Sequence, residues 1–180
     1  MLPPDELYLA LYARLKDPQT YHYALHISPN QENLDPLICQ STKFHCKNIL
    51  QSTDGDFTVI TWVYETIKIN SNFDSRLLVR VLLGKLESGS IDKVTRLFAE
   101  VPVVQDDPEF NCITWVRRAL LRLKQSDIVE GDKLEWDKIK QTALDYVEKK
   151  KQQGRFETTW TADSSRVPTF DMLLGREVAI

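Results

Sequence analysis

The stretch Thr20-Tyr21-His22-Tyr23-Ala24-Leu25-His26-Ile27-Ser28 predicts a β-strand, because aromatic and apolar side chains dominate it and the turn signal Ser28-Pro29-Asn30 ends it. The preceding segment, Glu6 to Arg14, has apolar or aromatic residues at both alternating sets of positions, which suits a buried strand. Lys16-Asp17-Pro18 is a turn signal between the two segments. The chain therefore opens with two consecutive strands.

Three further segments have the composition of strands. They are Leu37 to Ile49, Phe57 to Ile67 and Leu77 to Leu86, and Thr53-Asp54-Gly55-Asp56 marks a turn between the first two. In the third segment, Val79, Val81 and Gly84 favour a strand over a helix. Consecutive strands joined by short turns predict an antiparallel sheet.

Beyond this region the apolar residues recur at helical spacing. The pattern predicts a short helix over Ser90 to Phe98, a second helix with Val116, Ala119, Leu120 and Leu123 on its apolar stripe, and a third from about Asp132 to Gln152. Lys149 to Lys151 suit the negative end of the third helix, and Gly154 offers a left-handed stop. We expect one α+β domain over residues 1–180, with strands mainly in 1–86, packed helices in 90–152 and an irregular tail in 153–180.

The composition excludes several functional classes. The chain has 180 residues, 42% hydrophobic and 27% charged, with a net charge of −3, so it lacks the basic surface expected of a nucleic-acid binder. It has no secretory signal and no stretch of about 20 apolar residues, so we expect no integral membrane segment. Three irregularly spaced cysteines indicate a reducing, cytoplasmic setting. No glycine-rich phosphate loop occurs, and we expect no cofactor.

Histidines on neighbouring strands are the first candidates for chemistry. A thiol enzyme needs a cysteine thiolate, a histidine that takes its proton, and a polar group that orients the histidine ring. His22 and His26 point to the same face of one strand about 13 Å apart, so one cysteine cannot use both directly. His45 lies on the next strand, and antiparallel pairing places it beside His22.

Cys112 is the candidate nucleophile. If Asn111 caps the second helix, Cys112 lies in the first turn, where free N–H groups lower the pKa of a thiol and bind an oxyanion. If Asp107 is the cap, with Pro108 next, Cys112 falls in the second turn and loses that advantage. A cysteine on an apolar stripe is also, more simply, a small core residue.

The other histidines and cysteines have weaker roles. His26 suits a structural position, Cys39 and Cys46 have no special context, and a strand sends Cys46 to the face opposite His45. A metal site built on His22, His26 and His45 lacks the usual close ligand pairs.

Three segments resemble the lecithin-retinol-acyltransferase-like branch of circularly permuted papain-like thiol enzymes. The segment Tyr21 to Ile27 resembles its first histidine strand, Phe44-His45 its second, and Asn111 to Val116 its Asn-Cys box, in the same order along the chain. The resemblance implies a permuted papain-like fold, His22 as base, His45 as the group that orients it, and Cys112 as the residue that forms an acyl-thioester. Ile113, Thr114 and Trp115 differ from that family's residues, which argues against a membrane-lipid substrate.

Nearly the whole chain is also similar to a group of small fungal proteins, including the tail Val167 to Asp171. In that context the expected substrate is a small or carrier-bound acyl compound of secondary metabolism. The alternative is a non-catalytic binding or scaffold protein that retains the papain-like fold and contacts a partner through aromatic residues such as Trp62 and Tyr64.

Overall fold

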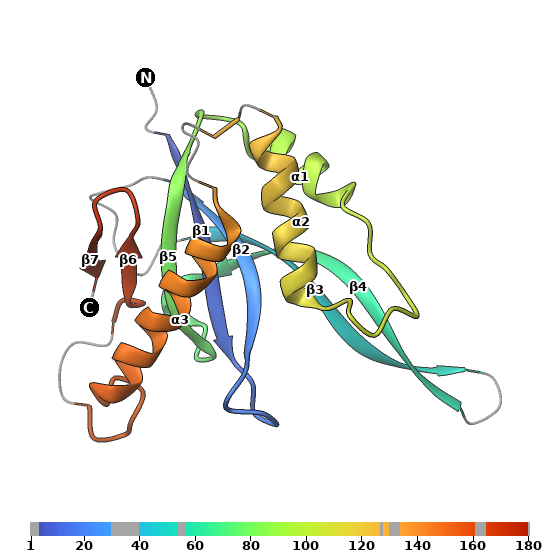
Figure 1. The fold of residues 1–180 in the computed structure, drawn as a ribbon, viewed down its shortest axis with the longest axis horizontal. Helices are drawn as coiled ribbons and strands as arrows, with labels where there is room; N and C mark the ends of the chain where they lie inside the picture. The colour runs from blue at the N-terminus through green and yellow to red at the C-terminus, as the bar shows by residue number, and fades with distance from the viewer. Residues whose placement is uncertain are drawn as a thin grey trace.

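The described residues form seven strands, three α-helices and one short 3₁₀ helix. A computed structural model describes residues 4–29, 40–53, 57–126, 128–129, 134–160 and 165–179. The elements are β1 (Asp5–Ala13), β2 (Tyr21–Pro29), β3 (Gln40–Thr53), β4 (Phe57–Asn70), η2 (Ser71–Phe73), β5 (Leu77–Leu86), α1 (Ile91–Ala99), α2 (Cys112–Lys124), α3 (Trp136–Gln152), β6 (Thr169–Asp171) and β7 (Arg176–Ala179) (Figure 1).

All seven strands form one sheet in the order β4-β3-β2-β1-β5-β6-β7. Every neighbouring pair is antiparallel except β5 and β6, which run parallel. The three helices pack against one face of this sheet, α2 over β2 and β3 and α3 over β5 and β1 (Figure 1). The α+β class and the mainly antiparallel sheet are therefore confirmed.

The helix-covered face holds the hydrophobic core. Alternating residues of β1 and β2, among them Leu9, Leu11, Tyr23 and Leu25, point toward the helices and are 0–2% exposed. Aromatic rings join the layers: Phe44 of β3 contacts Phe98 of α1 with ring centroids 5.2 Å apart. The period-2 pattern of the strands and the 3.6-residue pattern of the helices thus meet at one apolar surface.

The predicted elements agree with the observed ones at most ends. Leu77–Leu86 is a strand, and the short helix begins after Ser90. The third helix ends at Gln152, and Gly154 has a φ of 76°, as its predicted role as a stop requires. Predicted positions 37–39, 54–56 and 132–133 lie outside the described residues.

One expectation about the end of the chain is wrong. The tail is not irregular, because β6 and β7 extend the sheet beyond β5. Lys149 to Lys151 lie in the last turn of α3 as predicted, and Lys150, which is 1% exposed, forms an ion pair with Glu177 of β7. The tail was missed because three- and four-residue strands are too short to show a periodic pattern.

No helix among the described residues has the length and apolar character needed to cross a bilayer.

Candidate functional site

Cys112 is the first residue of α2, and Asn111 is its cap. The backbone of Asn111 is extended, and its Oδ1 accepts hydrogen bonds from the N–H groups of Ile113 at 2.9 Å and Thr114 at 3.1 Å. Asp107 instead accepts from the N–H of Glu109 in the preceding turn. The structure thus selects Asn111 over Asp107, and Cys112 lies in the first helical turn.

The thiol of Cys112 is buried beside one cation. The residue is 0% exposed, and Nη2 of Arg14 donates a hydrogen bond to its Sγ at 3.4 Å. Tyr23 and Cys46 are close neighbours: burial, and then the charge of the Cys112 thiolate, raise the pKa of each to about 12. Arg14 therefore places a positive charge beside this sulfur.

His22, His45 and Glu65 form one hydrogen-bonded chain. Nε2 of His22 lies 2.7 Å from Nδ1 of His45, and Nε2 of His45 lies 2.8 Å from Oε2 of Glu65. Lys47 donates to the other carboxylate oxygen of Glu65 at 2.7 Å. The sequence therefore predicted the neighbouring pair His22 and His45 correctly.

The protonation states of the two histidines follow from that of Glu65, the last residue of the hydrogen-bonded chain. Bonds from Lys47 and then His45 hold the pKa of Glu65 below its usual range, so it is a carboxylate and only accepts. Burial, and then the charges of neighbours such as His45 and Lys43, lower the pKa of His22 to about 3. Burial also lowers the pKa of His45 to about 4, against the opposing bond from Glu65. Both rings are neutral at pH 7.

A neutral imidazole carries one ring proton, which fixes the tautomers. His45 donates its Nε2 proton to Glu65, so its Nδ1 is an acceptor. His22 must then donate its own proton from Nε2 to His45. The lone pair on Nδ1 of His22 is left available to accept a proton.

The histidine chain and the thiol occupy different sides of the sheet. Alternation along β2 directs Tyr23 toward the helices and His22 toward the opposite face, where its ring lies 6.1 Å from that of Tyr12. β2 and β3 pair only from Leu25 to Ile27, so they separate at the level of His22 and His45. No hydrogen bond joins Cys112 to either histidine in the described part of the chain.

The remaining predicted candidates are structural. His26 is 0% exposed and bonds through Nε2 to the hydroxyl of Tyr12 at 2.8 Å, which keeps it apart from the His22–His45 chain. Cys46 lies in the core on the face opposite His45, as predicted, and Cys39 lies outside the described residues. No group of three or more metal-ligating side chains gathers among the residues that the structure describes.

Trp62 and Tyr64 are half-buried, and their rings contact the core. The ring of Trp62 lies 5.6 Å from that of Phe110, and the ring of Tyr64 lies 5.3 Å from that of Trp115. Both residues are part of the core's margin.

Sequence reasoning missed Glu65 and Arg14. Glu65 had a usable signal: a hairpin centred on the turn at 54–56 places residue 65 opposite residue 45, which is the register observed. Arg14 had none, because it follows the end of β1 and reaches Cys112 from 98 residues away in the chain.

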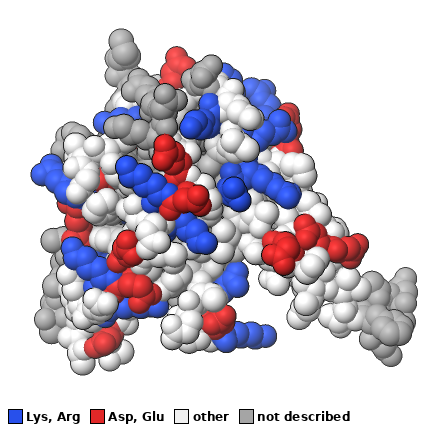
Figure 2. All heavy atoms as spheres, viewed as in Figure 1, with Lys and Arg blue, Asp and Glu red and all other residues white. Residues whose placement is uncertain are grey.

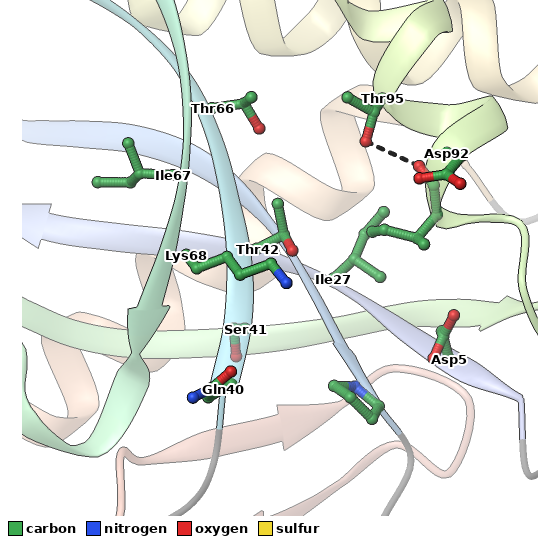
Figure 3. Close-up of a pocket in the computed structure, with 12 residues that line it drawn as sticks. Asp5, Ile27, Gln40, Ser41, Thr42, Thr66, Ile67, Lys68, Asp92 and Thr95 are labelled. Carbon is green, nitrogen blue, oxygen red and sulfur yellow. Dashed lines mark hydrogen bonds between the residues drawn. The ribbon is translucent and has the colours of Figure 1, made fainter.

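A cavity of about 420 Å³ lies at the other end of β2. Ile27, Thr42 and Thr66 line it from the sheet and Asp92 from α1, with the side chain of Lys68 directed across it (Figure 3). Ile27 is five residues from His22, or about 17 Å along a strand. Cys112, His22, His45 and Glu65 do not line this cavity.

Comparison with known proteins gives one match. The model of a family described as a family of unknown function, DUF6914, matches residues 5–179. Neither the curated proteins nor the solved structures contain a significant match.

Proposed function

We propose that this chain, which belongs to the DUF6914 family, carries out thiol-dependent acyl transfer or hydrolysis on a small or carrier-bound acyl substrate. Cys112 is the nucleophile, His22 the base and His45 the group that orients the base. The observation that carries the proposal is the chain from Glu65 through His45 to His22, because it leaves Nδ1 of His22 as a proton acceptor. A base held in one tautomer by a second polar group is the arrangement that thiol enzymes use.

The reaction has two steps with the proton returned at each. Nδ1 of His22 takes the proton of Cys112, the thiolate attacks the acyl carbonyl carbon, and the leaving group departs with that proton as the acyl-thioester forms. Water or an acceptor hydroxyl or amine then attacks the thioester, again losing its proton to His22, and the thiol of Cys112 is restored. Asn111 takes the N–H groups of Ile113 and Thr114, so the N–H of Cys112 itself stabilises the oxyanion in both steps.

Two further features support Cys112 as the nucleophile. Asn111 places it at the positive end of α2, and Arg14 donates to its sulfur, so two sources of positive potential favour the thiolate. The chain order His22, His45, Cys112 also matches the permuted papain-like thiol enzymes, whose fold forms part of this proposal.

The proposal requires the thiol and His22 to approach each other when substrate binds. Catalytic hydrogen bonds are often long in the absence of substrate and shorten in the complex. Between Tyr21 and Leu25, β2 is not paired with β3. The two side chains can meet there, because no backbone hydrogen bonds join the two strands. The alternative is a non-catalytic binding protein, and the complete burial of Cys112 favours it.

Selective labelling of the cysteines with iodoacetamide separates the two readings. Cys46 is the internal control, because it is as buried as Cys112 but lies in a strand and receives no hydrogen bond from a cation of the described residues. We expect Cys112 to label faster than Cys46 in the native protein at neutral pH, because burial raises the pKa of Cys46 to about 12. Peptide mass spectrometry resolves the sites.

The variants test each partner. His22→Ala and Arg14→Gln should each slow labelling of Cys112 at neutral pH by about tenfold, and His26→Ala should not. An activated acyl ester should then leave an acyl group on Cys112 of the wild type and not of His22→Ala. Labelling of Cys112 and Cys46 at equal rates, or only after unfolding, would show that Cys112 is a core residue and would exclude the enzyme reading.

A further inference from the structure

The cavity beside α1 contains charged side chains of both signs. Its volume of about 420 Å³ lies within the range of about 300–1,000 Å³ typical of small-molecule sites. Lys68 of β4 enters it from one side, and Asp5 of β1 and Asp92 of α1 lie on the other (Figure 3). These three side chains form no ion pair or hydrogen bond with one another or with the rest of the described chain. Their charges are therefore available to a ligand.

The strand register keeps these charges apart. Lys68 lies opposite Thr42 of β3, and Thr42 lies opposite Ile27 of β2. Ile27 lies opposite Leu7 of β1, and Asp5 is two residues away on that strand. Three strand spacings of about 4.8 Å separate β4 from β1 by about 14 Å. Because side chains two residues apart on a strand share a face, Asp5 and Lys68 reach into the cavity from opposite sides and leave space for an elongated ligand.

Apolar groups lie between the charges. Ile27 is 2% exposed and belongs to the core, and Ile91 of α1 packs against the same core. Thr95 also lines the cavity, and its hydroxyl donates to the C=O of Ile91 at 2.7 Å. A ligand that fills this space therefore needs charged groups at its ends and methylene groups in the middle.

Asp5 and Asp92 can each bind one cationic group. Burial raises the pKa of Asp5, because a partly desolvated carboxylate is less stable as the anion. An ammonium or guanidinium group beside it would offset that cost. Asp92 extends from the first turn of α1 into the same cavity, so a second cationic group has a carboxylate of its own.

The charges of the lining select the ligand. A simple anion would meet the two carboxylates, and a polyamine would meet the ammonium group of Lys68. A molecule with one carboxylate and two cationic groups complements all three side chains. We propose that the cavity binds a free basic α-amino acid of the lysine, ornithine or arginine type. Its carboxylate lies on Lys68, its two cationic groups lie on Asp5 and Asp92, and its methylene chain packs on Ile27.

Isothermal titration calorimetry with L-lysine, L-ornithine and L-arginine tests the site. We expect one-to-one binding of at least one of them to the full chain. Norleucine has the carbon chain of lysine without the side-chain ammonium, and cadaverine lacks the carboxylate. Each should bind at least about tenfold more weakly than lysine, because each leaves one charge of the cavity unpaired. The proposal is overturned if none of the three amino acids binds, or if norleucine binds as tightly as they do.

Variants of the lining assign the contacts. Lys68→Met keeps the apolar stem and should weaken binding of the amino acid at least about tenfold, while it should strengthen binding of cadaverine by removing a like charge. Asp92→Asn should weaken both ligands. Lys124→Met is the matched control, because Lys124 is an exposed lysine of α2 outside the cavity.

Lys68 and Asp92 are exposed, so these variants should keep the wild-type circular dichroism spectrum and thermal unfolding. Equal binding of the amino acid by Lys68→Met and Lys124→Met would contradict the assigned carboxylate contact and overturn the proposal. The site does not depend on the proposed thiol chemistry.

Discussion

The two faces of the sheet bury different kinds of side chain. Toward the helices, β1 and β2 present leucines and tyrosines, and Trp115 and Phe98 close the layer with ring centroids 6.1 Å apart. Toward the other face the same strands present Tyr12, His22 and His26, with Lys43 and His45 from β3. Alternate residues of one strand point to opposite faces. Each of these strands therefore contributes apolar side chains to the core on the helix-covered face and titratable side chains to the other face.

The polar face costs stability where its groups lack partners. Nε and Nη1 of Arg80 and Nδ1 of His26 are buried, and the described residues offer them no hydrogen-bond partner. Arg80 also lies over the ring of Tyr8, with Cζ 4.6 Å from the centroid, so part of its charge is compensated by the aromatic face. The polar face thus buries neutral histidines next to cations, an arrangement that costs stability.

The largest contrast between the faces should appear when the core is truncated. Trp115→Ala removes a fully buried indole that packs between Tyr64 and Phe98, and it should lower the free energy of unfolding by about 3–5 kcal/mol. Trp115→Phe keeps an aromatic ring and removes part of the indole together with an N–H that has no partner within the described residues, so it should cost less than half as much. Urea unfolding measures both. Equal losses for the two variants would contradict a close-packed helix face.

The polar face should make stability depend on pH. Complete burial, and then the charges of Arg80 and Lys43, lower the pKa of His26 well below its usual value. Below about pH 6.5 the unfolded chain binds a proton at each histidine while folded His22, His26 and His45 remain neutral, down to about pH 3 for His22 and 4 for His45. The free energy of unfolding should therefore be highest above about pH 6.5 and should decrease as the pH falls below that value.

His26→Gln isolates one contribution to that slope. Glutamine keeps hydrogen-bonding atoms but takes up no proton, so the free energy of unfolding between about pH 6 and 4.5 should change less steeply, by about 1.4 kcal/mol per pH unit. Urea titrations at several pH values give the slope. An unchanged slope would mean that His26 binds its proton equally well in the folded and unfolded chain.

Local patterns predicted the elements and the histidine pair, and long-range contacts decided the rest. Alternation, composition and turn signals identified β1 to β5, and strand neighbourhood alone placed His45 beside His22. Arg14 beside Cys112 depends on how α2 packs across β2 and β3, which no local pattern encodes. The separation of β2 from β3 beyond Leu25 is equally invisible, because the sequence continues in strand-like residues on both sides.

The cap of α2 allows the test with the smallest expected effect. It addresses the thiol on the helix-covered face without changing the histidine face. Asn111→Ala removes the acceptor for two N–H groups and should cost about 1 kcal/mol of stability. Asn111→Ser and Asn111→Asp both keep a cap and should restore most of that loss, the carboxylate also favouring the helix dipole. Their effects on Cys112 should differ, because only the aspartate adds a negative charge beside the thiol. Iodoacetamide labelling at pH 7 should be close to wild type in Asn111→Ser and several-fold slower in Asn111→Asp. Equal labelling of the two variants would mean that electrostatics at the helix start do not control this thiol, and the case for a nucleophile at Cys112 would then depend on His22 alone.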